Sequence, residues 1–117
     1  FAFTMERVPP LVREALEVAG WTLEMVDGAI FHQANGFIVD HLRRKVGLSR
    51  EKVPVAIDRF GNTGGSSLPL AMTQGGLVRP ADRAMRLLLL AYGVGLSWGS
   101  ITLALPADVP LIHSELP

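Results

Sequence analysis

The sequence MRLLLLAY occupies residues 85–92 and points to the fold class, because it is almost wholly apolar and about as long as a buried strand. Gly93-Val94-Gly95 interrupts this run, and residues 98–105, which are rich in β-branched and apolar side chains, follow as a second strand. A shorter apolar run at residues 29–32 precedes them in the chain. The sequence therefore predicts three strands, two of which are neighbours in sequence.

Helical periodicity predicts a first helix over residues 8–19, where apolar side chains recur every three to four positions. Pro9 and Pro10 fit the first turn of a helix, where a missing backbone N–H costs little. Gly20 fits its end, since glycine adopts the left-handed conformation that closes many helices.

Two further helices are expected, over residues 35–46, ending at Gly47, and over residues 66–78. A polar, glycine-rich loop is predicted for residues 58–67, and residues 106–117 are expected to be an irregular tail because prolines recur in it. The resulting order of helices and strands indicates an α/β layered domain. Three apolar strands need cover on both faces and at their edges. We therefore expect this chain to be a piece of a longer protein whose remaining part supplies further strands.

Composition excludes several classes of function. The 11 basic and 11 acidic side chains balance, which gives no sign of a nucleic-acid partner or a membrane surface. The longest apolar run is about half of the roughly 20 residues that a membrane span needs. The chain has no cysteine and its three histidines are scattered, so no metal site and no thiol nucleophile are expected. A cytoplasmic location is the default expectation.

The segment His32-Gln33-Ala34-Asn35 is the first candidate for chemistry. His32 ends a predicted buried strand just before a helix, where the helix dipole favours a neutral imidazole that donates one hydrogen bond. Asn35 offers both a donor and an acceptor to an amide-containing ligand. Spacing alone favours the alternative that His32 caps local structure.

Two glycine-rich segments are further candidates. In residues 61–67, Asn62 is placed to present a fixed donor, although the segment matches neither a Walker A motif nor a dinucleotide fingerprint, and an ordinary turn is the alternative. In residues 92–99, backbone N–H groups at the glycine turn are suited to half of an oxyanion hole, or the segment is simply a hairpin between core strands.

Residues 95–99 also match the Gly-x-Ser-x-Gly nucleophile elbow, and Asp108 and His113 follow Ser97 in the order of a hydrolase triad. An elbow requires a strand, a sharp turn and then a helix. Here a strand follows the serine instead, and too few residues separate Ser97 from His113. The local context therefore argues against a hydrolase.

Taken together, the three segments resemble the C-terminal region of the β-ketoacyl-acyl carrier protein synthase III family, over about residues 8–105. The similarity lies in the order of His-Gln-Ala-Asn, Gly-Asn-Thr and Tyr-Gly-Val-Gly-Leu-Ser-Trp-Gly. The resemblance implies a thiolase-like fold in which two similar halves form five αβαβα layers, usually in a homodimer. Residues 1–117 would then be an incomplete C-terminal half, with 106–117 as its tail.

The resemblance also implies a division of the chemistry. The N-terminal half supplies a Cys that takes an acyl group from coenzyme A or a carrier protein. The C-terminal half supplies a His and an Asn, here His32 and Asn62, which assist decarboxylation of a malonyl thioester by stabilising the enolate oxygen. The backbone N–H of Val94 would join the Cys amide in the oxyanion hole. The residues implied at the phosphopantetheine arm and thioester are Asn35, Tyr92 and Gly93.

The chain departs from the family pattern at two places. Members that use a carrier protein often have Arg where this chain has Phe37, so docking would fall to the basic residues of the next turns, Arg43, Arg44 and Lys45. Residues 64–66 are Gly-Gly-Ser where many members have Ser-Ala-Ala, without loss of a reactive group.

The expected function is thus the C-terminal catalytic half of a 3-oxoacyl-[acyl-carrier-protein] synthase III-like acyltransferase in fatty acid or polyketide synthesis, inactive alone for lack of the Cys. The resemblance implies that no cofactor is permanently bound and that the substrates are thioesters of coenzyme A or phosphopantetheine. It implies two partners, a Cys-bearing N-terminal half and an acyl carrier protein. Two alternatives are a non-catalytic pantetheine-binding or partner subunit, and an acyltransferase to oxygen or nitrogen. We expect poor solubility or self-association of the isolated half.

Overall fold

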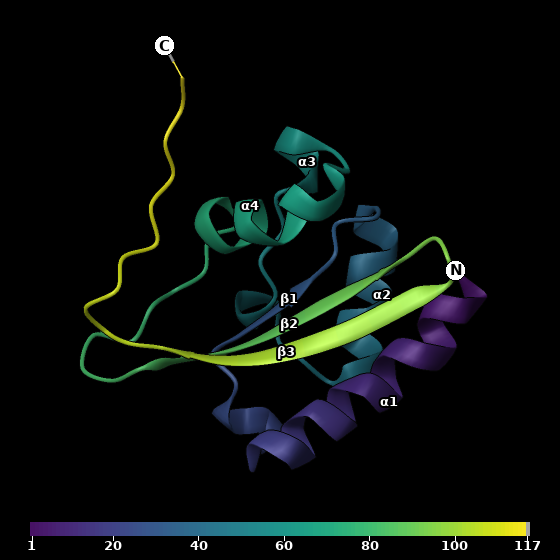
Figure 1. The fold of residues 1–117 in the computed structure, drawn as a ribbon, viewed down its shortest axis with the longest axis horizontal. Coiled ribbons are helices and arrows are strands. Elements are labelled where there is room, and N and C mark those ends of the chain that lie inside the picture. Colours follow the sequence, from purple (N-terminus) through teal and green to yellow (C-terminus); the bar gives the residue numbers. More distant parts are fainter. Residues whose placement is uncertain (117) are drawn as a thin grey trace.

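One three-stranded sheet organises the chain in a computed structural model, which describes residues 1–116 (Figure 1). The strands are β1 (Gly28–Phe31), β2 (Met85–Gly93) and β3 (Ser97–Leu105), in the order β1-β2-β3. The parallel pairing of β1 with β2 sets Phe31 opposite Leu90, and β2 and β3 form an antiparallel hairpin. All three predicted strands are confirmed, and the first is displaced by one residue.

Helices cover both faces of this sheet. The α-helices are α1 (Ala2–Ala19), α2 (Gly36–Val46), α3 (Ile57–Phe60) and α4 (Ser67–Gln74). Short 3₁₀ turns are η1 (Leu23–Met25), η2 (Arg50–Lys52) and η3 (Gly64–Ser66). Side chains of α1 and α2 pack with those on one face of β1 and β2, and side chains of α4 pack on the other. The predicted α/β layered arrangement is confirmed.

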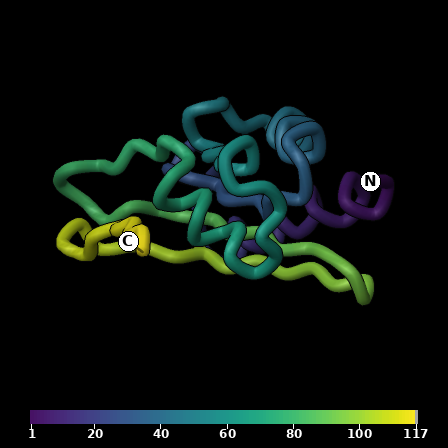
Figure 2. The backbone as a smooth tube through the Cα atoms, turned by 90° about the horizontal axis from the view of Figure 1, so that it is seen from above, coloured from purple at the N-terminus to yellow at the C-terminus, as the bar shows by residue number. Residues whose placement is uncertain are grey.

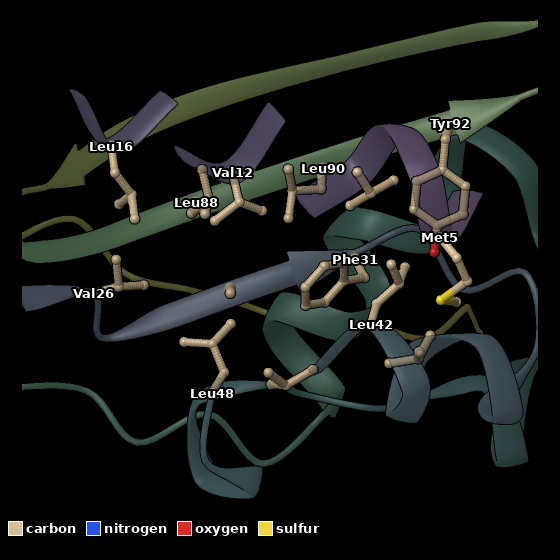
Figure 3. Packing of buried hydrophobic residues seen from close by; sticks show 14 residues of the cluster. Met5, Val12, Leu16, Val26, Phe31, Leu42, Leu48, Leu88, Leu90 and Tyr92 are labelled. Carbon is tan, nitrogen blue, oxygen red and sulfur yellow. The ribbon is translucent and has the colours of Figure 1, made fainter. Parts of the chain in front are cut away.

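Strand alternation explains why both faces are apolar. Phe31 and Leu90 point toward α1 and α2, whereas Ile30 and Leu87 point toward α4. All four are fully buried, as expected for strands covered on both sides. Figure 3 shows Phe31 of β1 facing Leu42 of α2 in the larger of the two clusters.

Helix α1 begins earlier than the sequence predicts, so Pro9 and Pro10 lie inside it rather than in its first turn. Proline at position 9 cannot donate to the carbonyl of Met5. Nζ of Lys45, on α2, donates to that carbonyl at 2.9 Å. A side chain 40 residues away thus satisfies the acceptor that the proline leaves open, and the prediction of a helix starting at residue 8 is wrong.

The substitution Lys45→Met is therefore expected to lower the free energy of unfolding by about 1 kcal/mol, the usual contribution of one such hydrogen bond. Urea unfolding of both variants measures it. Lys52→Met is the matched control, because Lys52 also donates to a backbone carbonyl, that of Glu24, but at an exposed position. Equal losses in the two variants would contradict a special role for Lys45 at the proline.

The segment between α2 and β2 differs most from the prediction. The expected loop over residues 58–67 contains α3 and η3, and the expected helix over 66–78 is shorter, spanning Ser67–Gln74 as α4. Close packing explains the early end of α4: a Cβ on Gly75 would lie 2.4 Å from Cβ of Pro54 and 2.5 Å from the carbonyl oxygen of Ala71. Gly75 approaches Pro54 so closely that a residue with a side chain does not fit at this position, and the helix ends before it.

Strand β3 forms one edge of the sheet, and Figure 2 shows it on the outer side of the molecule. Its side chains Trp98, Ile101 and Leu103 are exposed. Residues 106–116 contain no helix or strand, and Figure 1 shows them running away from the sheet. No helix among residues 1–116 combines the length and the apolar character that a bilayer crossing requires.

Candidate functional site

His32 follows the last residue of β1 and is held there by backbone pairing. Its N–H donates to the carbonyl of Leu90 on β2 at 2.8 Å, which continues the parallel ladder by one residue. The hydroxyl of Tyr92, two residues further along β2, donates to the carbonyl of His32 at 2.9 Å. The Tyr92 ring also meets the imidazole edge to face, with centroids 5.5 Å apart. Two strands therefore fix the main chain and the ring plane of His32.

Ser67, the first residue of α4, contacts the imidazole from the other side. Its Oγ lies 2.8 Å from Nδ1 of His32 and accepts the backbone N–H of Gln33 at 3.3 Å. Gln33 is itself fully buried: its Nε2 donates to the carbonyl of Phe31 at 2.7 Å, and its Oε1 accepts the N–H of Ala56 at 3.1 Å. These bonds join three parts of the chain around the histidine: β1, the residue that precedes α3, and the start of α4.

Burial lowers the pKa of His32 below its ordinary value. The imidazole is therefore neutral at neutral pH, as the sequence predicts, but the cause is desolvation. The expected cause was the dipole of α2, which begins four residues after His32, at Gly36. Burial likewise raises the pKa of Tyr92, which keeps its hydroxyl a hydrogen-bond donor.

This lowered pKa predicts how stability depends on pH. An unfolded imidazole titrates near 6.5, so as the pH falls below that value the unfolded chain binds a proton before folded His32 does. The free energy of unfolding is expected to decrease as the pH falls from about 6.5 toward the lower pKa of the folded state, and His32 contributes no pH dependence above that window. Urea unfolding at a series of pH values measures it, with His32→Gln as the comparison. A slope unchanged in His32→Gln would contradict the assignment.

Asn62 lies in the loop between α3 and η3, and its side chain is oriented by its own loop. The amide oxygen Oδ1 accepts the N–H of Gly64 at 3.1 Å. The side-chain NH₂ group is then the part of Asn62 that remains to donate to a ligand. Gly61 before it has a φ of 67°, a conformation that glycine adopts without strain, and this shapes the turn.

One cavity of about 580 Å³ brings together most of the residues predicted to act. The predicted residues that line it are His32, Asn62, Tyr92, Gly93 and Val94. Phe1, Phe3 and Thr4 of the N-terminal segment complete its wall. A second cavity of about 440 Å³ shares His32, Tyr92 and Gly93 and extends toward Trp98. His32 thus borders both cavities.

Asn35 does not line either cavity, and its side chain caps α2. Oδ1 of Asn35 accepts the N–H of Ile38 at 2.9 Å, so Asn35 precedes the helix rather than starting it. Asn35 as a residue is exposed, and its side-chain NH₂ is the part left to donate to a ligand. Its predicted role at the phosphopantetheine arm stays a prediction.

The three basic residues of α2 are already engaged within the chain to different degrees. Arg43 donates to Asp40 at 2.8 Å and to the carbonyl of Leu48 at 2.9 Å, and Lys45 bonds Met5 as described above. Arg44 is exposed and also pairs with Asp40. The two guanidinium groups lower the pKa of Asp40 to about 2. Arg44 and Lys45 are exposed and Arg43 is half-buried, so Arg44 and Lys45 are the more open of the three to a partner.

Sequence reasoning gave no role to Ser67 or Gln33, although both lie in the candidate segments. Ser67 contacts His32 and Gln33 across more than 30 positions of sequence, and the side chain of Gln33 contacts Ala56 across 23. The His41 ring lies against Phe37, with centroids 4.4 Å apart and an angle of 42° between the rings, and Phe1 is next to it. No short-range pattern signals the Ser67 contact, whereas Phe37 and His41 are four residues apart on α2, a spacing that brings side chains together on a helix.

Strand β3 begins at Ser97, so the Gly-x-Ser-x-Gly match lies in a hairpin and not at a strand-to-helix elbow. This agrees with the exclusion of a hydrolase. Within the described residues, no three His, Asp or Glu side chains gather closely enough to hold a metal ion. The hydrogen-bonding side chains that line the larger cavity include His32, Asn62 and Tyr92.

Comparison with known proteins places these features in a family context. Residues 16–105 match the family model described as 3-oxoacyl-[acyl-carrier-protein (ACP)] synthase III C terminal. The chain is 38% identical over 108 residues to a β-ketoacyl-[acyl-carrier-protein] synthase III of Streptococcus suis, covering 90% of this chain and 33% of the relative. A synthase III of Streptomyces coelicolor is 37% identical over 114 residues, covering 95% of this chain and 33% of the relative.

A solved structure shows the same relationship. The crystal structure of a 3-oxoacyl-(acyl-carrier protein) synthase from Burkholderia xenovorans superimposes with a TM-score of 0.83 at 40% identity, covering 91% of this chain and 30% of that one. The chain thus forms part of a thiolase-like fold and spans about a third of the length of the proteins it matches.

Proposed function

The chain belongs to the 3-oxoacyl-[acyl-carrier-protein] synthase III family, as its C-terminal region, and we propose that it supplies His32 and Asn62 to a condensing acyltransferase of fatty acid or polyketide synthesis. The reaction is the decarboxylative condensation of an acyl thioester with a malonyl thioester. The observation that carries the proposal is the cavity lined by both residues together with Tyr92, Gly93 and Val94.

The chemistry of the proposal rests on neutral donors. Loss of carbon dioxide from a malonyl thioester leaves an enolate, whose oxygen carries the developing negative charge. The neutral imidazole of His32 and the side-chain NH₂ of Asn62 stabilise that oxygen without changing their own charge. The enolate carbon then attacks the acyl thioester held on a Cys, a new carbon–carbon bond forms, and the Cys thiolate leaves.

The chain has no Cys, so the nucleophile comes from the other part of the enzyme. The backbone N–H of Val94, from this chain, and the backbone N–H of that Cys together form an oxyanion hole for acyl transfer. Tyr92, Gly93 and the amide nitrogen of Asn35 line the path of the phosphopantetheine arm. No cofactor stays bound, and the thioesters of coenzyme A or a carrier protein pass through as substrates.

The partners in this proposal are the Cys-bearing N-terminal half, a second copy in a homodimer and an acyl carrier protein, in the cytoplasm. Arg44 and Lys45 are the exposed basic residues for carrier docking, and Arg43 lies beside them. Because Phe37, 63% exposed, stands where carrier-using members often have Arg, a coenzyme A thioester is an equally suitable donor.

The test supplies this chain with the Cys-bearing remainder of a synthase III, either mixed or fused as one polypeptide. Acyl-coenzyme A is added with malonyl-carrier protein or with malonyl-coenzyme A, and the 3-oxoacyl product is followed by mass spectrometry. Product is expected only when both parts are present. Condensation by this chain alone would overturn the mechanism, since no residue of the chain is a thiol.

A binding role without catalysis is the competing outcome of the same experiment. If the fused protein folds and its Cys becomes acylated but no 3-oxoacyl product forms with either malonyl donor, the chain does not complete a condensing site. Acyl transfer to water, alcohols or amines in that fused protein would favour an oxygen or nitrogen acyltransferase instead.

A further inference from the structure

Ser67 is a buried polar residue to which the reaction described above assigns no task. Its side chain is 1% exposed, and it stands at the start of α4. The preceding Ser66 is the N-cap of that helix, and its side chain makes no capping bond. The hydroxyl of Ser67 instead contacts two groups of the His32 segment, Nδ1 of His32 at 2.8 Å and the N–H of Gln33 at 3.3 Å.

The direction of these two bonds follows from the number of donors. A hydroxyl has one proton to donate and two lone pairs to accept with. The N–H of Gln33 can only donate, so Oγ of Ser67 is an acceptor in that bond. The hydroxyl proton of Ser67 then has Nδ1 of His32 as its acceptor, provided that Nδ1 carries no proton.

The opposite arrangement leaves a buried group unpaired. If Nδ1 of His32 carried the proton, it would donate to Oγ of Ser67, and Oγ would accept twice. The hydroxyl proton of Ser67 would then need a third partner, and none is present for it among residues 1–116. Buried hydroxyl groups without an acceptor are unfavourable and rare, so the first arrangement is preferred.

The groups that keep Ser67 and His32 in contact are themselves held by hydrogen bonds. The side-chain amide of Gln33 is bonded at both its nitrogen and its oxygen inside the fold. These bonds hold the residue in place, and with it the backbone N–H that Gln33 donates to Ser67. The carbonyl of His32 accepts the Tyr92 hydroxyl and also the N–H of Ala34, at 2.9 Å each. The backbone around His32 therefore has little freedom to rotate the ring away from Ser67.

We propose that Ser67 is a positioning residue that holds His32 as the neutral tautomer protonated on Nε2. This inference deepens the proposed function, because the Nε2 proton is then the one that His32 offers to the enolate oxygen. Ser67 acts only through His32, and no contact with substrate is required of it. Gln33 supports the arrangement by presenting its N–H to the same hydroxyl.

The test reads the tautomer directly in the full chain, without any reaction. With ¹⁵N-labelled histidine, long-range ¹H–¹⁵N NMR distinguishes a protonated ring nitrogen from an unprotonated one. Wild-type His32 is expected to show a protonated Nε2 and an unprotonated Nδ1 above its pKa. A wild-type spectrum with the proton on Nδ1 would overturn the proposal, whatever the activity of the assembled enzyme.

Variants separate positioning from simple stabilisation. Ser67→Ala is expected to give a mixture of the two tautomers, Ser67→Thr to restore the single one, and Ser66→Ala to leave it unchanged. In the fused enzyme, kcat of Ser67→Ala should fall in proportion to the fraction of rings that lose the Nε2 proton. A folded Ser67→Ala protein that keeps the wild-type tautomer would refute the role of Ser67, while leaving the proposed condensing function intact.

Discussion

Replacing His32 by Ala is expected to lower kcat of the condensation in the fused enzyme by about 10²–10³-fold, the usual effect of removing one preorganised donor at a developing oxyanion. The loss should fall on the decarboxylating step, because His32 and Asn62 line the same cavity and, in the proposed mechanism, both donate to the enolate oxygen. Acylation of the Cys by acyl-coenzyme A should change far less. Quenched-flow mass spectrometry of the two half-reactions separates these rates.

Two further substitutions make this experiment sharper. His113→Ala is the matched control, because His113 lies in the tail after β3, next to Glu115. Asn62→Asp keeps the size of the side chain and the oxygen that accepts the N–H of Gly64, but replaces the donating NH₂ by a negatively charged oxygen. It is therefore expected to reduce kcat at least as much as His32→Ala. Equal losses in both half-reactions would indicate a structural role.

The substitution Phe31→Ala is expected to lower the free energy of unfolding by about 3–5 kcal/mol, which is typical for the loss of a buried aromatic side chain. Phe31 is fully buried between β2 and α2, in contact with the cluster that contains Leu42 and Leu90 (Figure 3). A cavity would remain there, because the parallel pairing fixes the backbone of β1. Urea unfolding followed by circular dichroism measures the effect.

Phe37→Ala provides a control of the same residue type. Phe37 is 63% exposed and its ring meets those of Phe1 and His41, so its removal should lower stability by less than about 1 kcal/mol. If Phe31→Ala does not fold, Phe31→Leu, which keeps much of the volume, allows the comparison. Similar losses in the two alanine variants would contradict the assignment of the core.

The strands were predictable because their signals are local. Residues 85–92 are apolar on both faces, and a strand covered by helices on both sides needs that composition. Gly20 and Gly47 also marked the ends of α1 and α2 correctly, since both adopt the left-handed conformation there. His32 and Asn62 were predicted as site residues only because three motifs occur in one order, and both line one cavity in the structure.

The errors arose where distant groups decide local structure. Pro9 suggests a helix start until Lys45, from another helix, is seen to satisfy the carbonyl of Met5. The early end of α4 depends on how closely Gly75 approaches Pro54. Ser67 bonds His32 across 35 positions, and no periodicity in sequence encodes such a contact. These features follow from tertiary packing, which residue patterns do not contain.

The parallel pairing of β1 with β2 has a consequence for the order of folding. Gly28 pairs with Leu87 across the whole middle of the chain, whereas β2 and β3 are joined by a short turn. Closing the long loop costs more entropy and delays the contact, so the hairpin should form first. Pulse-labelled hydrogen exchange should then show amides of β2 protected before those of β1. His32 and Tyr92 therefore come into contact only when β1 pairs with β2, which is the slow step. The candidate site is then complete only after the β2–β3 hairpin has formed.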